Sequence, residues 1–356
     1  MSRFRGILFA IGAGTTALAL AGFGAAAWLR NGMWFPAETE AITVTSPTEA
    51  PVLARGTRLR VLSWNIQYAG SRKHHFFYDG GEAVHVPLDD VQTTLAEIAR
   101  VIAESEADVV LLQEVDRGSD RTHRIDQHVW LVEQLGYPAH ASAPYHRVGY
   151  LPHPTHAPLG RVEMHLTVMS RYALGSAQRQ SLPLLDEPAW RQAFNLRRQL
   201  MAVDLPLAGG GVLRTLNTHL SAFSKGDGTL DKQMATLDAA ATAAEKQAMP
   251  WLLVGDLNAL PPGDDPSRLG ADAVEYAEAV TPAQRLFDRH TSVIPAERFA
   301  REPEAFRTYL PFGADAPDRT LDYAFIGREV KLLGVEVLPV TTVSDHMPLL
   351  IDLEIP

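Results

Sequence analysis

Six short apolar segments of the chain end in, or contain, side chains that could do chemistry. These side chains are carboxylates, carboxamides and imidazoles: Asn65, Glu114, Asn217, His219, Asp256, Asn258, Asp322, Asp345 and His346. A polar residue at the end of one strand is common turn chemistry, but turn chemistry does not explain six such ends with oxygen or imidazole donors. Carboxylates gathered at one rim would repel each other unless a cation neutralised them. The pattern therefore indicates a cation site assembled from distant parts of the chain.

The motifs that carry these residues resemble, in order, those of the endonuclease/exonuclease/phosphatase superfamily. They are Trp64-Asn65-Ile66, Gln113-Glu114-Val115-Asp116, Asn217-Thr218-His219-Leu220, Gly255-Asp256-Leu257-Asn258, Leu321-Asp322-Tyr323 and Ser344-Asp345-His346-Met347-Pro348-Leu349. That superfamily includes DNase-like nucleases, abasic-site endonucleases, neutral sphingomyelinases and inositol-polyphosphate phosphatases. The resemblance covers residues 59–356 and implies a four-layer α/β sandwich, in which helices flank two packed mixed sheets.

The resemblance also implies a metal site. Glu114 would be the principal ligand of Mg²⁺ or Mn²⁺, assisted by Asn65 and Asp345, and oxygen ligands suit such a hard ion. For Asn65 the alternative is a cap at the end of a strand. For Asp345 the alternative is a residue that orients His346 without touching the metal.

The remaining motif residues resemble the family's catalytic groups. His346, held by Asp322, would activate or orient the attacking water, because the carboxylate fixes the imidazole tautomer and supports proton uptake. Asp256 would position the nucleophile or assist the leaving group, and Asn258 would bond the scissile phosphate. His219 would donate a hydrogen bond to a phosphate oxygen as negative charge develops.

The segment that follows Glu114 is rich in arginine. Arg117, Arg121 and Arg124 could bind a substrate phosphate by bidentate hydrogen bonds, and Arg197 and Arg198 pose the same question more weakly. The alternative is a solvated loop with internal ion pairs. The acidic partners would then be Asp116, Asp120 and Asp126.

Residues 140–165 contain five of the thirteen histidines. They are His140, His146, His153, His156 and His165. One interpretation is a second metal site, but the spacings match no recognised ligand pattern. The favoured interpretation is a long loop, interrupted by prolines, whose histidines are solvated or shape the substrate pocket. Of the five, His165 is the one expected to reach substrate, because it stands near a position where most relatives have a small residue.

Apolar periodicity predicts the elements that must position these side chains. Apolar residues three and four apart predict an amphipathic helix over 88–105, and a second helix is predicted over 230–247. Strands are predicted at 60–66, 108–113, 164–169, 199–205, 212–217, 251–255, 321–326, 332–338 and 347–353. Mixed strands and helices, with hairpin-like pairs late in the chain, favour two packed sheets flanked by helices.

The first thirty residues are unlike the rest of the chain. Residues 6–29 contain no charged side chain, and the run is long enough to cross a bilayer as a helix. We predict a transmembrane anchor over residues 1–30, with a cleavable signal segment as the alternative. The catalytic domain would then lie outside the cytoplasm, on a bacterial-type inner membrane or secreted after cleavage. Residues 31–58, without periodicity, are predicted as a linker, and residues 59–356 as the catalytic domain.

Composition limits the chemistry and the partners. The 356 residues include no cysteine, which excludes disulfides, thiolate metal sites and a cysteine nucleophile. The formal net charge is −10, although the first thirty residues contain three arginines and no acidic residue. Affinity for nucleic acid comes mainly from cationic side chains, so this balance argues against polymeric nucleic acid as the substrate.

Three functional hypotheses follow. The leading one is Mg²⁺-dependent hydrolysis of a phosphodiester, in a lipid head group or another small molecule near the membrane, by metal-assisted attack of water. The second is an extracytoplasmic endonuclease or exonuclease. The third is an inactive binding module, which is disfavoured because no expected ligand or water-activating residue is missing. No protein partner can be inferred.

Overall fold

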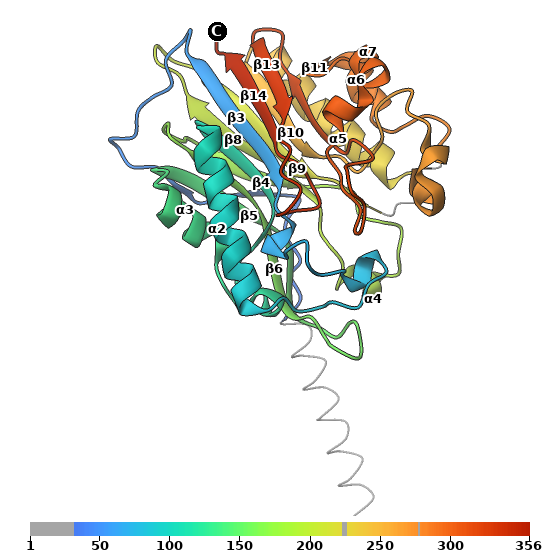
Figure 1. The fold of residues 1–356 in the computed structure, drawn as a ribbon. Helices are drawn as coiled ribbons and strands as arrows, with labels where there is room; N and C mark the ends of the chain where they lie inside the picture. Colours follow the sequence, from blue (N-terminus) through green and yellow to red (C-terminus); the bar gives the residue numbers. More distant parts are fainter. Residues whose placement is uncertain (1–31, 223–225, 277) are drawn as a thin grey trace, which may run out of the picture.

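The computed structural model describes residues 32–222, 226–276 and 278–356, which form two seven-stranded mixed sheets packed against each other (Figure 1). One sheet has the order β13-β14-β3-β4-β6-β5-β2 and the other β1-β7-β8-β9-β10-β12-β11. The apolar helix predicted over residues 1–30 lies outside the described residues. Within the described part of the chain, no helix is both long enough and apolar enough to cross a membrane.

The first sheet carries the metal ligands expected early in the chain. Its strands are β2 (Val44–Thr45), β3 (Arg58–Asn65), β4 (Val109–Asp116), β5 (Ala139–Leu151), β6 (Gly160–Ser170), β13 (Lys331–Val337) and β14 (Leu349–Glu354). The second sheet carries most of the expected catalytic groups. Its strands are β1 (Thr39–Ala41), β7 (Ala177–Ser181), β8 (Gln199–Pro206), β9 (Val212–His219), β10 (Trp251–Asp256), β11 (Thr291–Ser292) and β12 (Asp322–Ile326).

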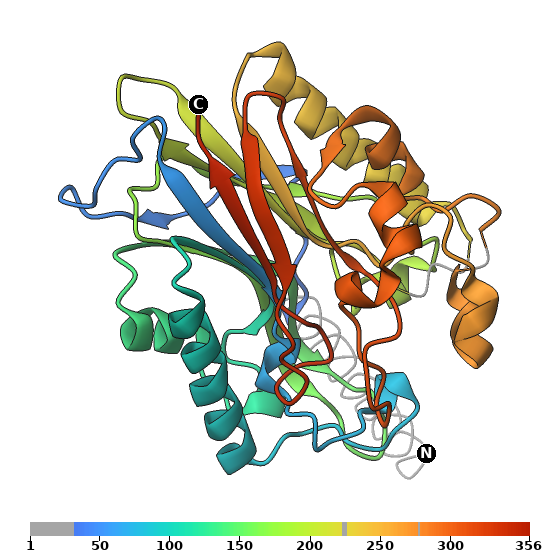
Figure 2. The same ribbon diagram turned by 45° about the horizontal axis from the view of Figure 1, so that its top comes forward.

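Helices cover the outer faces of both sheets, so the predicted layers are observed. The α-helices are α2 (Leu88–Ser105), α3 (Gln127–Leu135), α4 (Ala189–Gln192), α5 (Thr229–Lys246), α6 (Gln284–Arg289) and α7 (Ala296–Arg301). Figure 2 shows the two sheets between α2 and α3, in teal and green, and α5 to α7, in yellow to orange. Short 3₁₀ turns join the strands: η1 (Gln67–Ala69), η2 (Phe77–Asp79), η3 (Asp120–Thr122), η4 (Pro266–Tyr276) and η5 (Pro303–Phe306).

Two parallel strand pairs place the functional side chains at one end of the molecule. β3 pairs with β4 through the α2 crossover, and β9 pairs with β10 through the α5 crossover. Because the strands of each pair are parallel, their carboxyl ends lie at the same edge. Beneath this edge the buried Gln113 donates a hydrogen bond from Nε2 to Oδ1 of Asn217, 2.8 Å away, which links one sheet to the other.

Both predicted helices are confirmed. The helix over 88–105 has the predicted bounds, and it buries Val91, Leu95, Ile98 and Ile102 along one side. The second helix begins and ends one residue earlier than predicted. Each predicted strand overlaps an observed one, because an apolar run of that length fits a sheet with both faces covered.

Residues 32–58 do not form the free linker that we predicted. β1 pairs with β7 in one sheet and β2 pairs with β5 in the other, and the side chain of Leu53 is fully buried. These paired pieces are two or three residues long, which is too short to produce a periodic pattern. The segment is therefore part of the folded unit.

The prediction of a long loop over residues 140–165 is also wrong. β5 and β6 form an antiparallel hairpin that occupies most of this segment. Pro144 obscured the strand, because proline cannot donate to a ladder and is normally excluded from sheet interiors. Here it stands beside a register irregularity between Pro144 and His146, where a ladder tolerates proline.

Candidate functional site

The catalytic groups of the second sheet meet because β10 lies between β9 and β12. Asp256 is aligned with His219 on one side and with Asp322 on the other. This alignment depends on Gly255, whose φ is 146° and whose position leaves no room for a Cβ: one would lie 2.0 Å from the carbonyl oxygen of Thr218. A glycine at this position therefore brings β9 and β10 close enough for the acidic and imidazole groups to touch.

Glu114 projects into the site from an irregularity in β4. The pairing of β4 with β6 slips between Leu112 and Val115, and Glu114 has a φ of 57°. Such a left-handed conformation costs a non-glycine residue about 1 to 3 kcal/mol, and it is typical of functional positions. Its Oε1 lies 3.4 Å from Nδ2 of Asn65 and 3.7 Å from Nδ1 of His219. Burial raises the pKa of Glu114.

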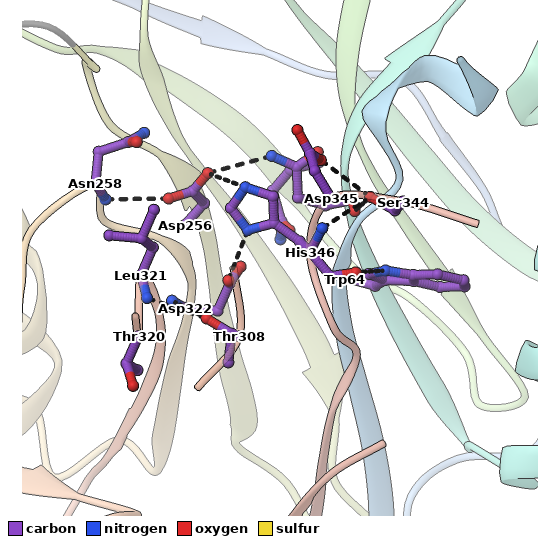
Figure 3. Close-up of polar contacts among 12 residues, drawn as sticks. Trp64, Asp256, Asn258, Thr308, Thr320, Leu321, Asp322, Ser344, Asp345 and His346 are labelled. Carbon is purple, nitrogen blue, oxygen red and sulfur yellow. Dashed lines mark hydrogen bonds and ion pairs between the residues drawn. The ribbon is translucent and has the colours of Figure 1, made fainter. Parts of the chain in front are cut away.

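His346 and Asp322 form a buried pair at the centre of the site (Figure 3). Nδ1 of His346 lies 2.7 Å from Oδ2 of Asp322, and Nε2 lies 3.5 Å from Oδ2 of Asp256. Burial alone would lower the pKa of His346, but the carboxylates of Asp322 and Asp256 outweigh it and raise the pKa well above its ordinary value. The arrangement keeps Nδ1 on Asp322 and directs Nε2 toward Asp256.

Neighbouring groups fix the orientation of this pair. The Oγ1 of Thr308 accepts hydrogen bonds from the backbone N–H groups of Leu321 and Asp322, at 3.0 and 3.1 Å (Figure 3). The indole N–H of Trp64 donates to the carbonyl oxygen of His346 at 2.8 Å. The rings of Tyr309 and His346 meet edge to face, with centroids 5.1 Å apart. Neither partner of the pair can move without breaking buried contacts.

Asp256 is the point where the two halves of the site join. Its Oδ2 accepts from Nδ2 of Asn65 at 3.2 Å and lies 3.3 Å from Nε2 of His219, while its Oδ1 accepts from the backbone N–H of Asn258 at 3.0 Å. Burial raises the pKa of Asp256 to about 6. Asn258 donates from Nδ2 to the carbonyl oxygen of Leu220, which leaves the second N–H of this amide for another acceptor.

Asp345 completes the acidic cluster from the first sheet's side. Its Oδ2 accepts a hydrogen bond from Nε2 of Gln67 at 2.9 Å, and burial raises its pKa to about 6. Glu114 contributes to this rise by repulsion between the two carboxylates. Gln67 was not anticipated from the sequence; its one signal is that it stands two residues after Asn65.

The donor set fits a hard divalent cation. Glu114 and Asp345 supply carboxylate oxygen atoms, and the raised pKa values of Glu114, Asp256 and Asp345 are those of buried carboxylates that lack sufficient positive charge. Asn65 instead directs Nδ2 toward Glu114 and Asp256, and its Oδ1 accepts from the backbone N–H of Gln67 at 3.0 Å, as a cap at the end of a strand would. Asp256, Asp322 and His346 also bring donor atoms within 4.8 Å of one another. In that second group, however, Nδ1 of His346 is already engaged by Asp322.

The arginines that follow Glu114 are held by acidic neighbours. Arg117 pairs with Asp126 at 2.8 Å, and Arg124 pairs with Asp120 at 2.6 Å. Arg121 is buried, pairs with Asp116 at 2.9 Å and lies over the ring of Tyr68. The segment therefore contains the internal ion pairs of the alternative prediction, although Arg121 is buried and not solvated. Among the described residues, neither Arg117 nor Arg121 hydrogen-bonds the acidic cluster of the site, although the positive charge of Arg121 acts to lower the pKa of Glu114.

His140, His146 and His165 lie on the strands β5 and β6, whereas His153 and His156 lie in the loop that joins these two strands. His165 lies 2.8 Å from Oγ of Ser142 and 3.3 Å from Oε1 of Glu163, and it is buried. Nε2 of His146 bonds the carbonyl oxygen of Phe194, and His140 bonds His128. Across the described residues, these histidines form no group of three side chains able to hold a metal.

Arg198 emerges as a further candidate that the sequence signalled only weakly. Its side chain is buried, and its Nη1 has no hydrogen-bond partner among the described residues. Burial lowers its pKa, and the charges of Glu114 and Asp256 act in the opposite direction, so the guanidinium lies within electrostatic reach of both. Tyr145 was also missed, and its hydroxyl lies 3.4 Å from Nδ1 of His219.

Comparisons with known proteins agree with this geometry. The structure is similar to an endonuclease/exonuclease/phosphatase from Beutenbergia cavernae, with a TM-score of 0.58 and 24% identity over 84% of this chain and 72% of that one. It is similar to the human nocturnin catalytic domain, with a TM-score of 0.53 and 16% identity over 88% of this chain and 96% of that one. It is also similar to TDP2 from C. elegans, with a TM-score of 0.51 and 14% identity over 84% of this chain and 76% of that one. These similarities show a common fold.

No curated protein that was compared matches the sequence. The sequence profile of the Endonuclease/Exonuclease/phosphatase family matches residues 62–346, a span that contains every candidate catalytic and metal-binding residue named above. The chain therefore belongs to the endonuclease/exonuclease/phosphatase family, whose members hydrolyse phosphoester bonds and typically depend on a divalent metal.

Proposed function

We propose that this protein is a Mg²⁺-dependent phosphodiesterase that acts at a membrane, outside the cytoplasm, on a lipid head group or a similarly small phosphodiester. The observation that carries the proposal is the buried His346–Asp322 pair, which faces Asp256 beside the acidic cluster of Glu114 and Asp345. Water activation and charge neutralisation are the two things that hydrolysis of a phosphodiester needs.

Glu114 and Asp345 would hold the cation. Bound there, Mg²⁺ would supply positive charge to the phosphate oxygens and so stabilise the charge that develops in the transition state. The repulsion of Asp345 by Glu114 supports this placement, while Asn65 donates from Nδ2 to both Glu114 and Asp256 and so orients these carboxylates. Gln67 holds Asp345 in the orientation that faces Glu114.

His346 and Asp256 would handle the attacking water. His346 would activate or orient the water through Nε2, and Asp322 and Asp256 stabilise its imidazolium form. Asp256 would position the water, since its Oδ2 lies 3.5 Å from Nε2 of His346. Asp322 does not touch the substrate in this scheme, and it acts by orienting the imidazole.

Polar groups around Asp256 would hold the phosphate. His219 is close to both Glu114 and Asp256, and Asn258 retains a free amide N–H beside Asp256. The unpartnered Nη1 of Arg198 is the cationic donor that the arginines of 117–124 do not provide, because those are neutralised by Asp116, Asp120 and Asp126. The same neutralisation makes residues 117–124 a poor surface for polymeric nucleic acid, whose affinity depends on free cationic side chains, and this favours a small substrate.

The substrate class can be tested with the full chain in a Mg²⁺ buffer. Sphingomyelin, phosphoinositides, bis-p-nitrophenyl phosphate and plasmid DNA would be compared, with Glu114→Gln as the inactive variant. Asp352→Asn is a matched carboxylate control, because Asp352 pairs with Arg58 and Arg60 on the opposite edge of the sheet. We expect lipid and small-diester hydrolysis that Glu114→Gln abolishes and Asp352→Asn retains. Plasmid cleavage at physiological salt without lipid hydrolysis would establish a nuclease instead.

A further inference from the structure

The described chain begins at the same end of the molecule as the site. Met33 bridges Val148 near the end of β5. The end of β5 forms a hairpin with the beginning of β6. The beginning of β6 lies beside the end of β4, because these two strands are antiparallel, and β4 ends at Asp116 just after the candidate metal ligand Glu114. In Figure 1 the C-terminus marks the opposite end, at the top, while the hairpin and α4 lie at the bottom. The apolar run of residues 6–29 therefore joins the domain at its functional end.

The connection between the apolar run and the domain is short. Only residues 30–32 separate Leu29 from Met33, which already pairs with β5. Even a fully extended chain spans at most about 3.5 Å per residue, so the four steps from Leu29 to Met33 cover roughly 14 Å. If residues 6–29 cross a bilayer, this end of the domain must lie at the bilayer surface.

Exposed aromatic side chains collect at this end. Among the residues that the structure describes, the exposed Phe, Tyr and Trp side chains are Phe35, Tyr78, Tyr150, Trp190 and Phe312. Two of them are largely open to solvent, with exposed fractions of 60% for Phe35 and 66% for Trp190. Exposed aliphatic residues also occur elsewhere: Val52 and Leu333 lie toward the opposite end of the sheets.

The positions of these aromatic residues follow from the topology. Trp190 is on α4, in the connection between Ser181 of β7 and Gln199 of β8, and Leu200 of β8 pairs with Thr218, the neighbour of His219. Phe312 follows Leu310, whose backbone N–H donates to the carbonyl oxygen of Asp345. The Tyr78 hydroxyl accepts from Gln67, which also holds Asp345. All three residues therefore lie on connections that surround the site.

Arginines accompany the exposed rings. The guanidinium of Arg197 lies 4.8 Å from the ring centroid of Phe35, that of Arg191 lies 5.4 Å from Trp190, and that of Arg72 lies 5.9 Å from Phe312. Aromatic rings prefer the interfacial region of a bilayer, where one side is apolar and the other wet. Arginine binds phosphate, and basic side chains at a membrane surface are attracted to lipid head groups.

We propose that this end of the molecule is a membrane-docking surface, in which Phe35, Trp190 and Phe312 enter the interfacial layer of a phospholipid bilayer and Arg72 and Arg197 contact lipid phosphates. The site then opens directly onto the head groups. The docking itself follows from the exposed rings and the short connection to residues 6–29. Only the statement that the docked head groups are the substrate rests on the proposed function.

The absence of cysteine makes a direct test straightforward. Single substitutions Phe35→Cys, Trp190→Cys and Phe312→Cys would each receive a nitroxide label, with Val52→Cys and Leu333→Cys as controls at the opposite end. The full chain would be reconstituted into vesicles of phosphatidylcholine and phosphatidylglycerol. Collision of each label with oxygen, which concentrates in the bilayer, would be compared with collision with a water-soluble nickel chelate.

Docking predicts at least a fivefold higher ratio of oxygen to nickel collisions at positions 35, 190 and 312 than at positions 52 and 333. Equal ratios at all five positions would overturn the proposal. Labels at 35, 190 and 312 that are shielded from both reagents before the protein is reconstituted into vesicles would overturn it as well, because they would show a contact between protein molecules. Hydrolysis of bis-p-nitrophenyl phosphate by the same samples tests the proposed function separately, since that substrate needs no bilayer.

Discussion

Nδ1 of His346 lies 2.7 Å from Oδ2 of Asp322, and both side chains are buried. Oδ1 of Asp322 has no hydrogen-bond partner among the described residues, so the described side-chain hydrogen bond of this carboxylate is the one with the imidazole. This contact fixes which ring nitrogen faces the rest of the site, and it stabilises the charged form of the ring. The account of hydrolysis given above depends on it.

Replacing Asp322 by asparagine should therefore reduce kcat about a hundredfold or more, because loss of a group that fixes a catalytic imidazole typically has an effect of that order. KM for bis-p-nitrophenyl phosphate should change little, since Asp322 does not face substrate. Steady-state kinetics of the variant, with its urea unfolding measured alongside, checks this. A kcat within threefold of the original, in a variant that remains folded, would show that Asp322 is not needed to orient His346.

Addition of Mg²⁺ should raise the melting temperature of the protein by several degrees. Burial raises the pKa values of Glu114 and Asp345, with added repulsion from Asp256 on Glu114 and from Glu114 on Asp345. A cation that binds only the folded state at a hundred times its Kd adds about 2.7 kcal/mol of stability. Differential scanning calorimetry with Mg²⁺ and with EDTA measures the shift. Glu114→Gln should remove most of it. A shift of equal size in that variant would place the cation elsewhere.

Arg198→Gln should lower kcat/KM by about tenfold to a hundredfold, because a donor to the charged phosphate oxygens would be lost. Arg117→Gln is the matched control: Arg117 is neutralised by Asp126 and should be dispensable for hydrolysis. Kinetics of both variants on the same diester provide the comparison. Equal losses in the two variants would contradict the assignment of phosphate contact to Arg198.

Acid should weaken the fold partly through His146. Burial lowers the pKa of His146 to about 4, below its ordinary value of 6.5. The unfolded chain therefore binds a proton between pH 6.5 and 4 that the folded chain does not. The contribution of His146 to the free energy of unfolding is therefore complete above pH 6.5 and is lost as the pH falls toward 4. About 2 kcal/mol of it is lost by pH 5.

The pH effect of His146 can be isolated with His146→Gln, which retains a donor for the carbonyl oxygen of Phe194. Urea unfolding at pH 7.5 and pH 5 would give the free energy of unfolding for each protein. The difference between the two pH values should be about 2 kcal/mol smaller in the variant. An identical pH dependence in both proteins would show that His146 becomes protonated in the folded state.

Much of the fold and of the site could be predicted because the informative residues follow regular strands and helices. Asn65 and Asp256 end strands, Asp322 begins one, and Glu114 lies two residues before the end of β4. The apolar run of each strand is visible in sequence, and the structure brings these side chains together. His346 follows the same logic, one turn before β14.

Other parts could not be predicted because their role arises only in three dimensions. Arg198 resembles any arginine in sequence, and only its burial without a partner for Nη1 distinguishes it. β1 and β2 are too short to show a pattern, yet they tie residues 32–58 to both sheets. Asp116 stands five residues before Arg121 in the sequence, but only the fold shows that the Arg121 guanidinium pairs with Asp116 and does not remain available for a substrate phosphate.

The central claim is that Glu114 binds a divalent cation which acts together with His346 in phosphodiester hydrolysis. The most direct measurement is the rate of bis-p-nitrophenyl phosphate hydrolysis by the full chain as Mg²⁺ is titrated, for the original protein, Glu114→Gln and His346→Asn. We predict saturable Mg²⁺-dependent hydrolysis that EDTA abolishes, and rates at least a hundredfold lower in both variants. Hydrolysis that survives EDTA, or that either variant retains, would contradict the account.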